Sequence, residues 1–269
     1  MYKRFFAFGC SFTSYYWPTW ADIIGQEFGN NFYNLAMCGA GNEFVFHRLT
    51  EAHARHNITK DDLVIICWSN FAREDRYMQG KWRMSGNIFT QRRYSQHWVK
   101  KYFDLRGSLL KTSSVIAGAT HLLDTTNCDY VYTSMVPMNQ IDQNDIIFTG
   151  LDYQDIFSVY NQYYKKIKTS MTENLYGTLL SCWNPVPAVV KLESGNNTIV
   201  DHHPTPSQHL DYVRNIILPN LKNNIKISDS TVEWVDTWQA KVLSKPYFNA
   251  YKDGWTPEYR YNKWHKNMC

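Results

Sequence analysis

Residues 63–68 read LVIICW, an unbroken apolar run that directly follows two aspartates. Apolar residues without alternation are typical of a parallel strand whose two faces are both covered by helices. Two further short runs of this kind, residues 3–8 and 130–136, end at Gly9 and Pro137, respectively. The sequence therefore predicts a mostly parallel sheet built around these three strands.

Segments with apolar residues at helical spacing separate the predicted strands. The first begins at Thr19, with Asp22 three residues later as its capping-box partner. The last begins at Thr205, where Pro206 takes the first helical position and Gln208 the third. Further helices are expected over residues 43–55, 109–123 and 152–172. This alternation predicts a three-layer α/β/α fold with a flavodoxin-like, doubly wound, mostly parallel sheet.

The remaining segments complete the predicted organisation of the chain. Residues 31–36 are expected to form the second strand, and residues 198–200 a short fifth strand. We predict one domain over residues 1–225, with an irregular insertion at about 71–107. In the aromatic-rich extension 226–269 the pattern of strands and helices is lost, and we expect it to pack on the domain or on a partner.

Composition excludes several broad classes of protein. The chain has 269 residues, of which 44% are hydrophobic and 19% charged, an ordinary balance for a globular protein. Its net charge of +4 comes without the clustered basic face of a nucleic-acid-binding protein. No apolar run approaches the roughly 20 residues that cross a bilayer, and none resembles a signal peptide, so we expect a cytoplasmic protein. The six cysteines show neither CxxC nor zinc spacing, which favours reduced thiols.

Residues that can carry chemistry follow the predicted strands, where a parallel sheet places its ligand site. Ser11 lies in a turn after the first strand, and its hydroxyl becomes a nucleophile when a base removes the proton. His202 or His203 can be that base, oriented by Asp201. Gly39 follows the second strand and Asn70 the third, and their N–H groups can stabilise an oxyanion. Each residue alone is equally well explained as a turn former or a helix cap.

Together these residues resemble the SGNH/GDSL hydrolase superfamily. Its four sequence blocks carry a Ser in a Gly-x-Ser turn, a Gly, an Asn and a late Asp/His pair, in the order found here. Asn34, five residues before Gly39, also resembles the second block. The resemblance extends from about residue 4 to residue 221.

The resemblance implies the chemistry and the role of each residue. Ser11 would attack the acyl carbon of an ester, while His203 accepts its proton and Asp201 supports His203. The backbone N–H groups of Ser11 and Gly39 and the side-chain amide of Asn70 would form the oxyanion hole. Water would then release the acyl group, and neither a metal nor a cofactor would be needed.

The chain departs from the family pattern in three places. Residues 9–11 read Gly-Cys-Ser where the family usually has Gly-Asp-Ser, and residues 68–71 read Trp-Ser-Asn-Phe in place of Gly-x-Asn-Asp. Asp201 stands two residues before His203, where the family has three. We take His203 as the base because a proline follows it, as in the family. The shorter spacing leaves a Ser–His dyad open as an alternative to a triad.

Other chemistries compete for the same residues. Asp201, His202, His203 and His209 could form a metal site, although no second carboxylate cluster accompanies them. Cys10 could act as the nucleophile in place of the neighbouring serine. A non-catalytic glycan- or protein-binding module on the same fold, or an acyltransferase, would also fit the pattern.

The predicted substrate is a small-molecule or glycan ester, and we expect a small acyl group, acetyl, to be removed from a carbohydrate. Trp17, Trp20 and Trp68 lie near the nucleophile or the oxyanion loop in the sequence and could stack on sugar rings; they are equally well explained as core residues. Arg73 could reach the cleft. Nucleic acid and membranes are not expected partners, and the sequence does not indicate an oligomeric state.

Overall fold

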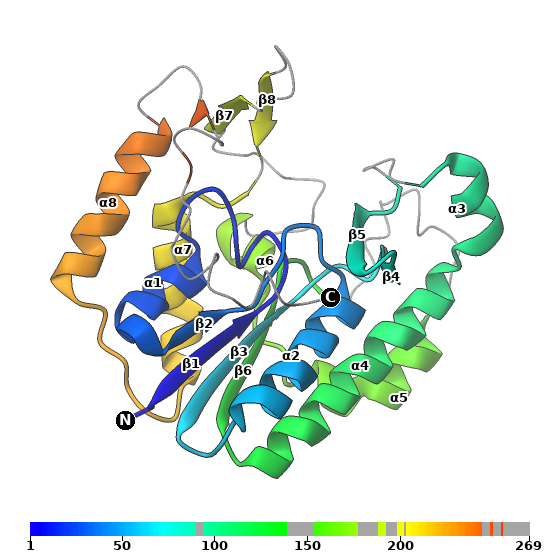
Figure 1. Ribbon diagram of the computed structural model, residues 1–269, viewed down its shortest axis with the longest axis horizontal. Helices are drawn as coiled ribbons and strands as arrows, with labels where there is room; N and C mark the ends of the chain where they lie inside the picture. The colour runs from blue at the N-terminus through cyan, green and yellow to red at the C-terminus, as the bar shows by residue number, and fades with distance from the viewer. Residues whose placement is uncertain are drawn as a thin grey trace.

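The central sheet has four parallel strands with helices on both faces (Figure 1). The computed structural model describes residues 1–89, 94–138, 153–176, 188–191, 198–201, 203–243, 248–249 and 254. Across the sheet the strands are β2 (Phe32–Asn34), β1 (Arg4–Phe8), β3 (Asp62–Trp68) and β6 (Asp129–Ser134). This order begins as a flavodoxin-like sheet does, so the predicted fold class is confirmed.

Side chains of each strand alternate between two apolar layers. In β1, Phe6 and Phe8 face one layer, whereas Phe5 and Ala7 face the other. The first layer is covered by α2 (Asn42–His56), α4 (Leu105–Thr126) and α5 (Gln154–Tyr164), and the second by α1 (Trp20–Gln26), α7 (Pro206–Tyr212) and α8 (Asp229–Leu243). Because both faces are dry, residues 63–68 show no polar alternation.

Both helix starts predicted from capping residues are confirmed. Thr19 precedes α1 and its backbone N–H donates to the Asp22 carboxylate at 2.9 Å, closing a capping box. Thr205 precedes α7 and its backbone N–H donates to the Gln208 side chain at 2.8 Å. These caps fix where the chain leaves the turns that follow the strands, and thus where the site residues lie.

The predicted fifth strand forms, but it pairs outside the central sheet. β8 (Thr198–Asp201) runs antiparallel to β7 (Ala188–Lys191), which also pairs with β9 (Phe248–Asn249). At the outer edge of β6, Ile167 forms a bridge with Tyr132, and the backbone N–H of the next residue donates to the Tyr132 carbonyl at 2.9 Å. This contact gives a hydrogen-bond donor to a β6 carbonyl on the side where no other described strand pairs with β6.

The same contact explains why the long helix predicted over 152–172 is wrong. The chain instead forms α5, an extended segment along β6, and then α6 (Met171–Tyr176). Helical spacing of apolar residues continues through this segment, so the sequence pattern alone does not show the break.

Two segments expected to be irregular contain regular structure. The insertion holds a hairpin, β4 (Arg73–Met78) and β5 (Lys81–Asn87), followed by α3 (Gln96–Tyr102). The C-terminal extension begins with α8, which packs on α1 and α7 and buries Val235 and Val242. Trp234 and Trp238 continue the same helical spacing and pack, partly buried, on the adjoining apolar clusters, so the apolar stripe of α8 includes tryptophans.

The buried His209 on α7 makes the free energy of unfolding depend on pH. Its side chain is fully buried and neither ring nitrogen has a hydrogen-bond partner among the described residues. Burial lowers the pKa of His209 to about 3. The unfolded chain, where a histidine has a pKa of about 6.5, therefore binds more protons than the folded one between these two pH values.

We expect the free energy of unfolding to fall as the pH drops below about 6.5, with this residue contributing up to about 1.4 kcal/mol per pH unit. Urea unfolding at pH 7 and pH 5 measures the effect. In His209→Leu the difference between the two pH values should shrink, whereas His97→Leu, at an exposed position on α3, should leave it unchanged. An identical pH dependence in wild type and His209→Leu would contradict the assignment.

Candidate active site

Ser11 is held in a tight turn directly after β1. The backbone N–H groups of Thr13 and Ser14 both donate to the Cys10 carbonyl, at 2.9 and 3.1 Å. A Cβ atom on Gly9 would lie 2.2 Å from the Thr13 hydroxyl oxygen, so only glycine fits before this turn. The turn places the Ser11 side chain at the carboxyl edge of the sheet.

A continuous chain of hydrogen bonds joins Ser11, His203 and Asp201. His203 Nε2 lies 2.8 Å from Ser11 Oγ, across 192 residues of sequence. His203 Nδ1 lies 2.8 Å from Asp201 Oδ1, and the same oxygen accepts the His203 backbone N–H at 2.7 Å. The two-residue spacing is therefore compatible with a direct carboxylate–imidazole contact, and the three groups are arranged as in a Ser–His–Asp triad.

Asp201 is buried and remains ionised. Burial acts to raise the pKa of Asp201, but hydrogen bonds from His203 and Tyr15 outweigh it and hold the pKa below its usual range. A carboxylate in this state can orient the imidazole and stabilise its protonated form.

Gly39 and Asn70 lie in the loops on either side of the turn that carries Ser11. Because β1 lies between β2 and β3, the loops that follow these two strands flank the Ser11 turn. Gly39 has a φ of 82°, in the left-handed region that favours glycine. Asn70 Oδ1 accepts the Ala72 backbone N–H at 2.6 Å, which leaves the side-chain NH₂ group of Asn70 as a donor.

The β4–β5 hairpin holds the Gly39 loop from outside. Gly86 N–H donates to the Gly39 carbonyl at 3.1 Å, and Arg73 Nη1 donates to the Ala40 carbonyl at 2.7 Å. The carboxylate of Asp75 accepts two backbone N–H groups at the start of α2, at 2.9 and 3.0 Å. Sequence reasoning missed Asp75, because it lies in the segment expected to be irregular.

The tryptophans expected to bind substrate lie in the protein core instead. Trp17, Trp20 and Trp68 are fully buried, so none offers a face to a sugar ring. Trp17 donates its indole N–H to the Pro204 carbonyl at 2.8 Å, and Trp68 packs on a buried tyrosine of β6. The assignment of these three tryptophans to substrate binding is therefore corrected. Arg73 is half-buried and supports the Gly39 loop, and its contact with a substrate stays a prediction.

Two residues near the Ser11–His203 pair were not singled out in the sequence. Tyr15 donates its hydroxyl to Asp201 Oδ2 and stacks on the His203 ring, and Phe12 packs on the same ring at 5.2 Å. The aromatic run that follows the nucleophile is visible in the sequence, but it does not indicate which of its members contacts the imidazole.

The alternative chemistries gain no support from the described residues. Among them, no group of three or more His, Cys, Asp or Glu side chains is placed to hold a metal ion. His202 lies outside the described residues, and His209 is buried in α7. Cys10 is fully buried and cannot present its thiol to a substrate.

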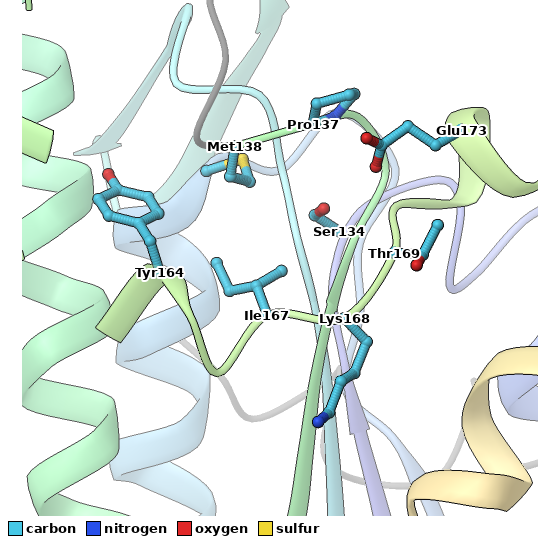
Figure 2. Close-up of a pocket in the computed structure, with 8 residues that line it drawn as sticks. All are labelled: Ser134, Pro137, Met138, Tyr164, Ile167, Lys168, Thr169 and Glu173. Atoms are coloured by element: carbon cyan, nitrogen blue, oxygen red, sulfur yellow. The ribbon is translucent and has the colours of Figure 1, made fainter. Parts of the chain in front are cut away.

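A separate cavity of about 180 Å³ lies at the carboxyl end of β6 (Figure 2). Its lining residues are Ser134, Pro137, Met138, Tyr164, Ile167, Lys168, Thr169 and Glu173. Figure 2 shows the Lys168 side chain extending away from Ser134 and Glu173. The Glu173 carboxylate accepts the Ser170 N–H and hydroxyl at 2.9 and 2.6 Å, so it serves to cap α6. The residues of the Ser11 site do not line this cavity.

The structure is thus an α/β fold that brings a serine, a histidine and a buried carboxylate together beyond the carboxyl ends of its parallel strands. Similar solved structures include a GDSL-like lipase from Bacteroides thetaiotaomicron, at 15% identity over 80% of this chain and 85% of that one, with a TM-score of 0.40. A putative acylhydrolase from Bacteroides fragilis is 16% identical over 87% of this chain and 88% of that one, with a TM-score of 0.40. A putative lipolytic protein of the G-D-S-L family from Desulfitobacterium hafniense is 11% identical over 90% of this chain and 99% of that one, with a TM-score of 0.38.

No family model and no curated protein matches the chain. Within the described ranges, every helix is too short or too polar to cross a bilayer.

Proposed function

We propose that this protein is a serine esterase that hydrolyses an ester bond through an acyl-enzyme. The observation that carries the proposal is the hydrogen-bond chain from Ser11 Oγ through the His203 ring to Asp201, with 2.8 Å at both links. A hydroxyl, an imidazole and a buried ionised carboxylate in this order form an activated nucleophile.

The reaction follows from the position of each group. His203 Nε2 takes the Ser11 proton as Ser11 Oγ attacks the acyl carbon. The resulting oxyanion would be held by the backbone N–H groups of Ser11 and Gly39 and by the Asn70 amide. His203 then gives its proton to the departing alcohol. Water, deprotonated by His203, attacks the acyl-enzyme and releases the acid and the Ser11 hydroxyl.

The acyl group in this proposal is small, with acetyl as its simplest form. Only 5% of the Ser11 surface is exposed, so a short acyl chain fits beside it more readily than a long one. The carbohydrate part of the earlier prediction loses its physical support, because the tryptophans expected to stack on sugars are buried. A panel of acetylated sugars against simple acetyl and medium-chain esters would measure both preferences.

Labelling with a fluorophosphonate tests the proposal directly. We expect the wild-type protein to gain one phosphonyl group, located on the Ser11 peptide by mass spectrometry, and Ser11→Ala to gain none. Ser14→Ala, a serine in the same turn whose hydroxyl has no role in the mechanism, should label as the wild type does. A wild-type protein that stays unlabelled, or Ser11→Ala that labels fully, would rule out the serine-nucleophile proposal and favour a binding module.

A further inference from the structure

The loop between Ser11 and α1 surrounds the imidazole that Ser11 contacts. Tyr15 in this loop is 7% exposed, and its ring lies parallel to the His203 ring, at 3.8 Å between centroids and 19° between planes. Its hydroxyl donates to Asp201 Oδ2, while Asp201 Oδ1 contacts His203. One side chain thus touches both His203, which contacts Ser11, and Asp201, which contacts His203.

We infer that Tyr15 is a positioning residue for the base: it locks the Asp201 carboxylate and stabilises the protonated imidazole that forms when Ser11 attacks. This inference rests on the proposed esterase function and adds a fourth residue to its machinery.

The locking follows from how the carboxylate oxygens are divided. Oδ1 of Asp201 accepts from the His203 ring and backbone, and Oδ2 accepts from Tyr15. With both oxygens bound, the carboxylate cannot turn away from the imidazole. Burial and the Asp201 charge raise the pKa of Tyr15, so its hydroxyl keeps its proton and remains a donor.

The stabilisation follows from the stacked ring. An aromatic face attracts a cation, and it does so more strongly where water is excluded. His203 carries a positive charge only after it has taken the Ser11 proton, so the Tyr15 face favours the transition state over the resting state. An interaction of this kind raises kcat and leaves KM unchanged.

The loop that carries His203 is held by the same segment that carries Ser11 and Tyr15. The peptide after the base is fixed to this segment, because Trp17 donates its indole N–H to the Pro204 carbonyl at 2.8 Å. The segment that carries the nucleophile therefore also fixes the loop that carries the base.

The test compares two pairs of a buried tyrosine and an aspartate. Tyr2 donates its hydroxyl to Asp129 at the opposite edge of the sheet, just as Tyr15 donates to Asp201. Tyr15→Phe and Tyr2→Phe each remove one hydroxyl from a buried carboxylate. Only the first should change catalysis, and kcat, KM and the pH profile of kcat/KM are the measurements.

For Tyr15→Phe we expect kcat to fall about tenfold at an unchanged KM. Loss of the hydroxyl removes one of the bonds that hold the pKa of Asp201 low, so the acid limb of the profile should move to higher pH. The limb belongs to the coupled Asp201–His203 pair, which faces the titratable groups of Tyr15, Cys38 and His209. Tyr15→Leu, which also removes the ring, should lose about 10²-fold in kcat.

An acid limb and a kcat in Tyr15→Phe that match those of Tyr2→Phe would overturn the inference. Fluorophosphonate labelling separates this result from failure of the proposed function: an unlabelled wild type refutes both, whereas a labelled and active wild type with an unaffected Tyr15→Phe refutes only the role of Tyr15. Phenylalanine retains the stacked ring, so this variant stays informative if Tyr15→Leu does not fold.

Discussion

Replacement of His203 by glutamine is expected to lower kcat for a small acetyl ester by about 10⁵–10⁶-fold, the range seen when a triad loses its base. His203 Nε2 is the described group that contacts Ser11 Oγ at 2.8 Å. Without it the serine hydroxyl keeps its proton, because an alcohol ionises far above neutral pH. Steady-state kinetics with a fluorogenic acetate ester, corrected for uncatalysed hydrolysis, would measure the loss.

A matched change separates the loss of the base from a general effect of losing a histidine. His97→Gln alters an exposed position on α3 and should retain wild-type kinetics. Unfolding curves of both variants would establish that they are folded at the assay temperature. If His203→Gln kept more than a tenth of the wild-type kcat, the base would have to be a different residue.

The proximity of Ser11 and His203 could be predicted because two local rules agree with one global rule. Gly9 and the capped helix after Thr205 each mark a turn that follows a strand. Parallel topology then brings the carboxyl ends of β1 and its neighbours to one edge. The sequence indicated the edge, but the path of the chain from β8 to His203 depends on pairing with β7, which no local pattern encodes.

The burial of Trp68 could have been predicted from the sequence. The continuous apolar run 63–68 indicated a strand covered on both faces, and this same reasoning places the side chain of its last residue in the core. Trp68 faces the layer formed by α2, α4 and α5, whereas α7, which follows the turn that carries His203, packs on the other layer. Closeness in sequence to a catalytic loop does not give a side chain access to its substrate.

Tyr15 and Asp75 mark the limit of sequence reasoning for this site. Both act through contacts with residues distant in the chain, Asp201 for Tyr15 and the Gly41 N–H for Asp75. A tyrosine four residues after the nucleophile, or an acidic residue in a hairpin, has no periodic or capping signature. Such supporting contacts become visible only when the chain is folded.

Replacement of Asp201 by asparagine is expected to lower kcat by about 10³–10⁴-fold, with little change in KM. Asparagine has no charge to stabilise the imidazolium, and its NH₂ group favours the wrong tautomer of His203. The pKa of Asp201 is held below its usual range, so at neutral pH the wild-type group is fully ionised and the comparison is between a carboxylate and a neutral amide. The measurement is kcat at pH 7 for both proteins.

The protein supplies a control of the same kind in Asp129, which is as buried as Asp201 and also accepts a tyrosine hydroxyl. Asp129→Asn should lower stability and leave kcat unchanged, because Asp129 begins β6 at the edge of the sheet away from Ser11. The pair of variants also decides between a triad and a dyad. If Ser11 and His203 act alone as a dyad, Asp201→Asn will lose less than about tenfold in kcat and will resemble Asp129→Asn. Asp201 contacts both the ring and the backbone of His203, so we expect instead that kcat of the two variants differs by orders of magnitude.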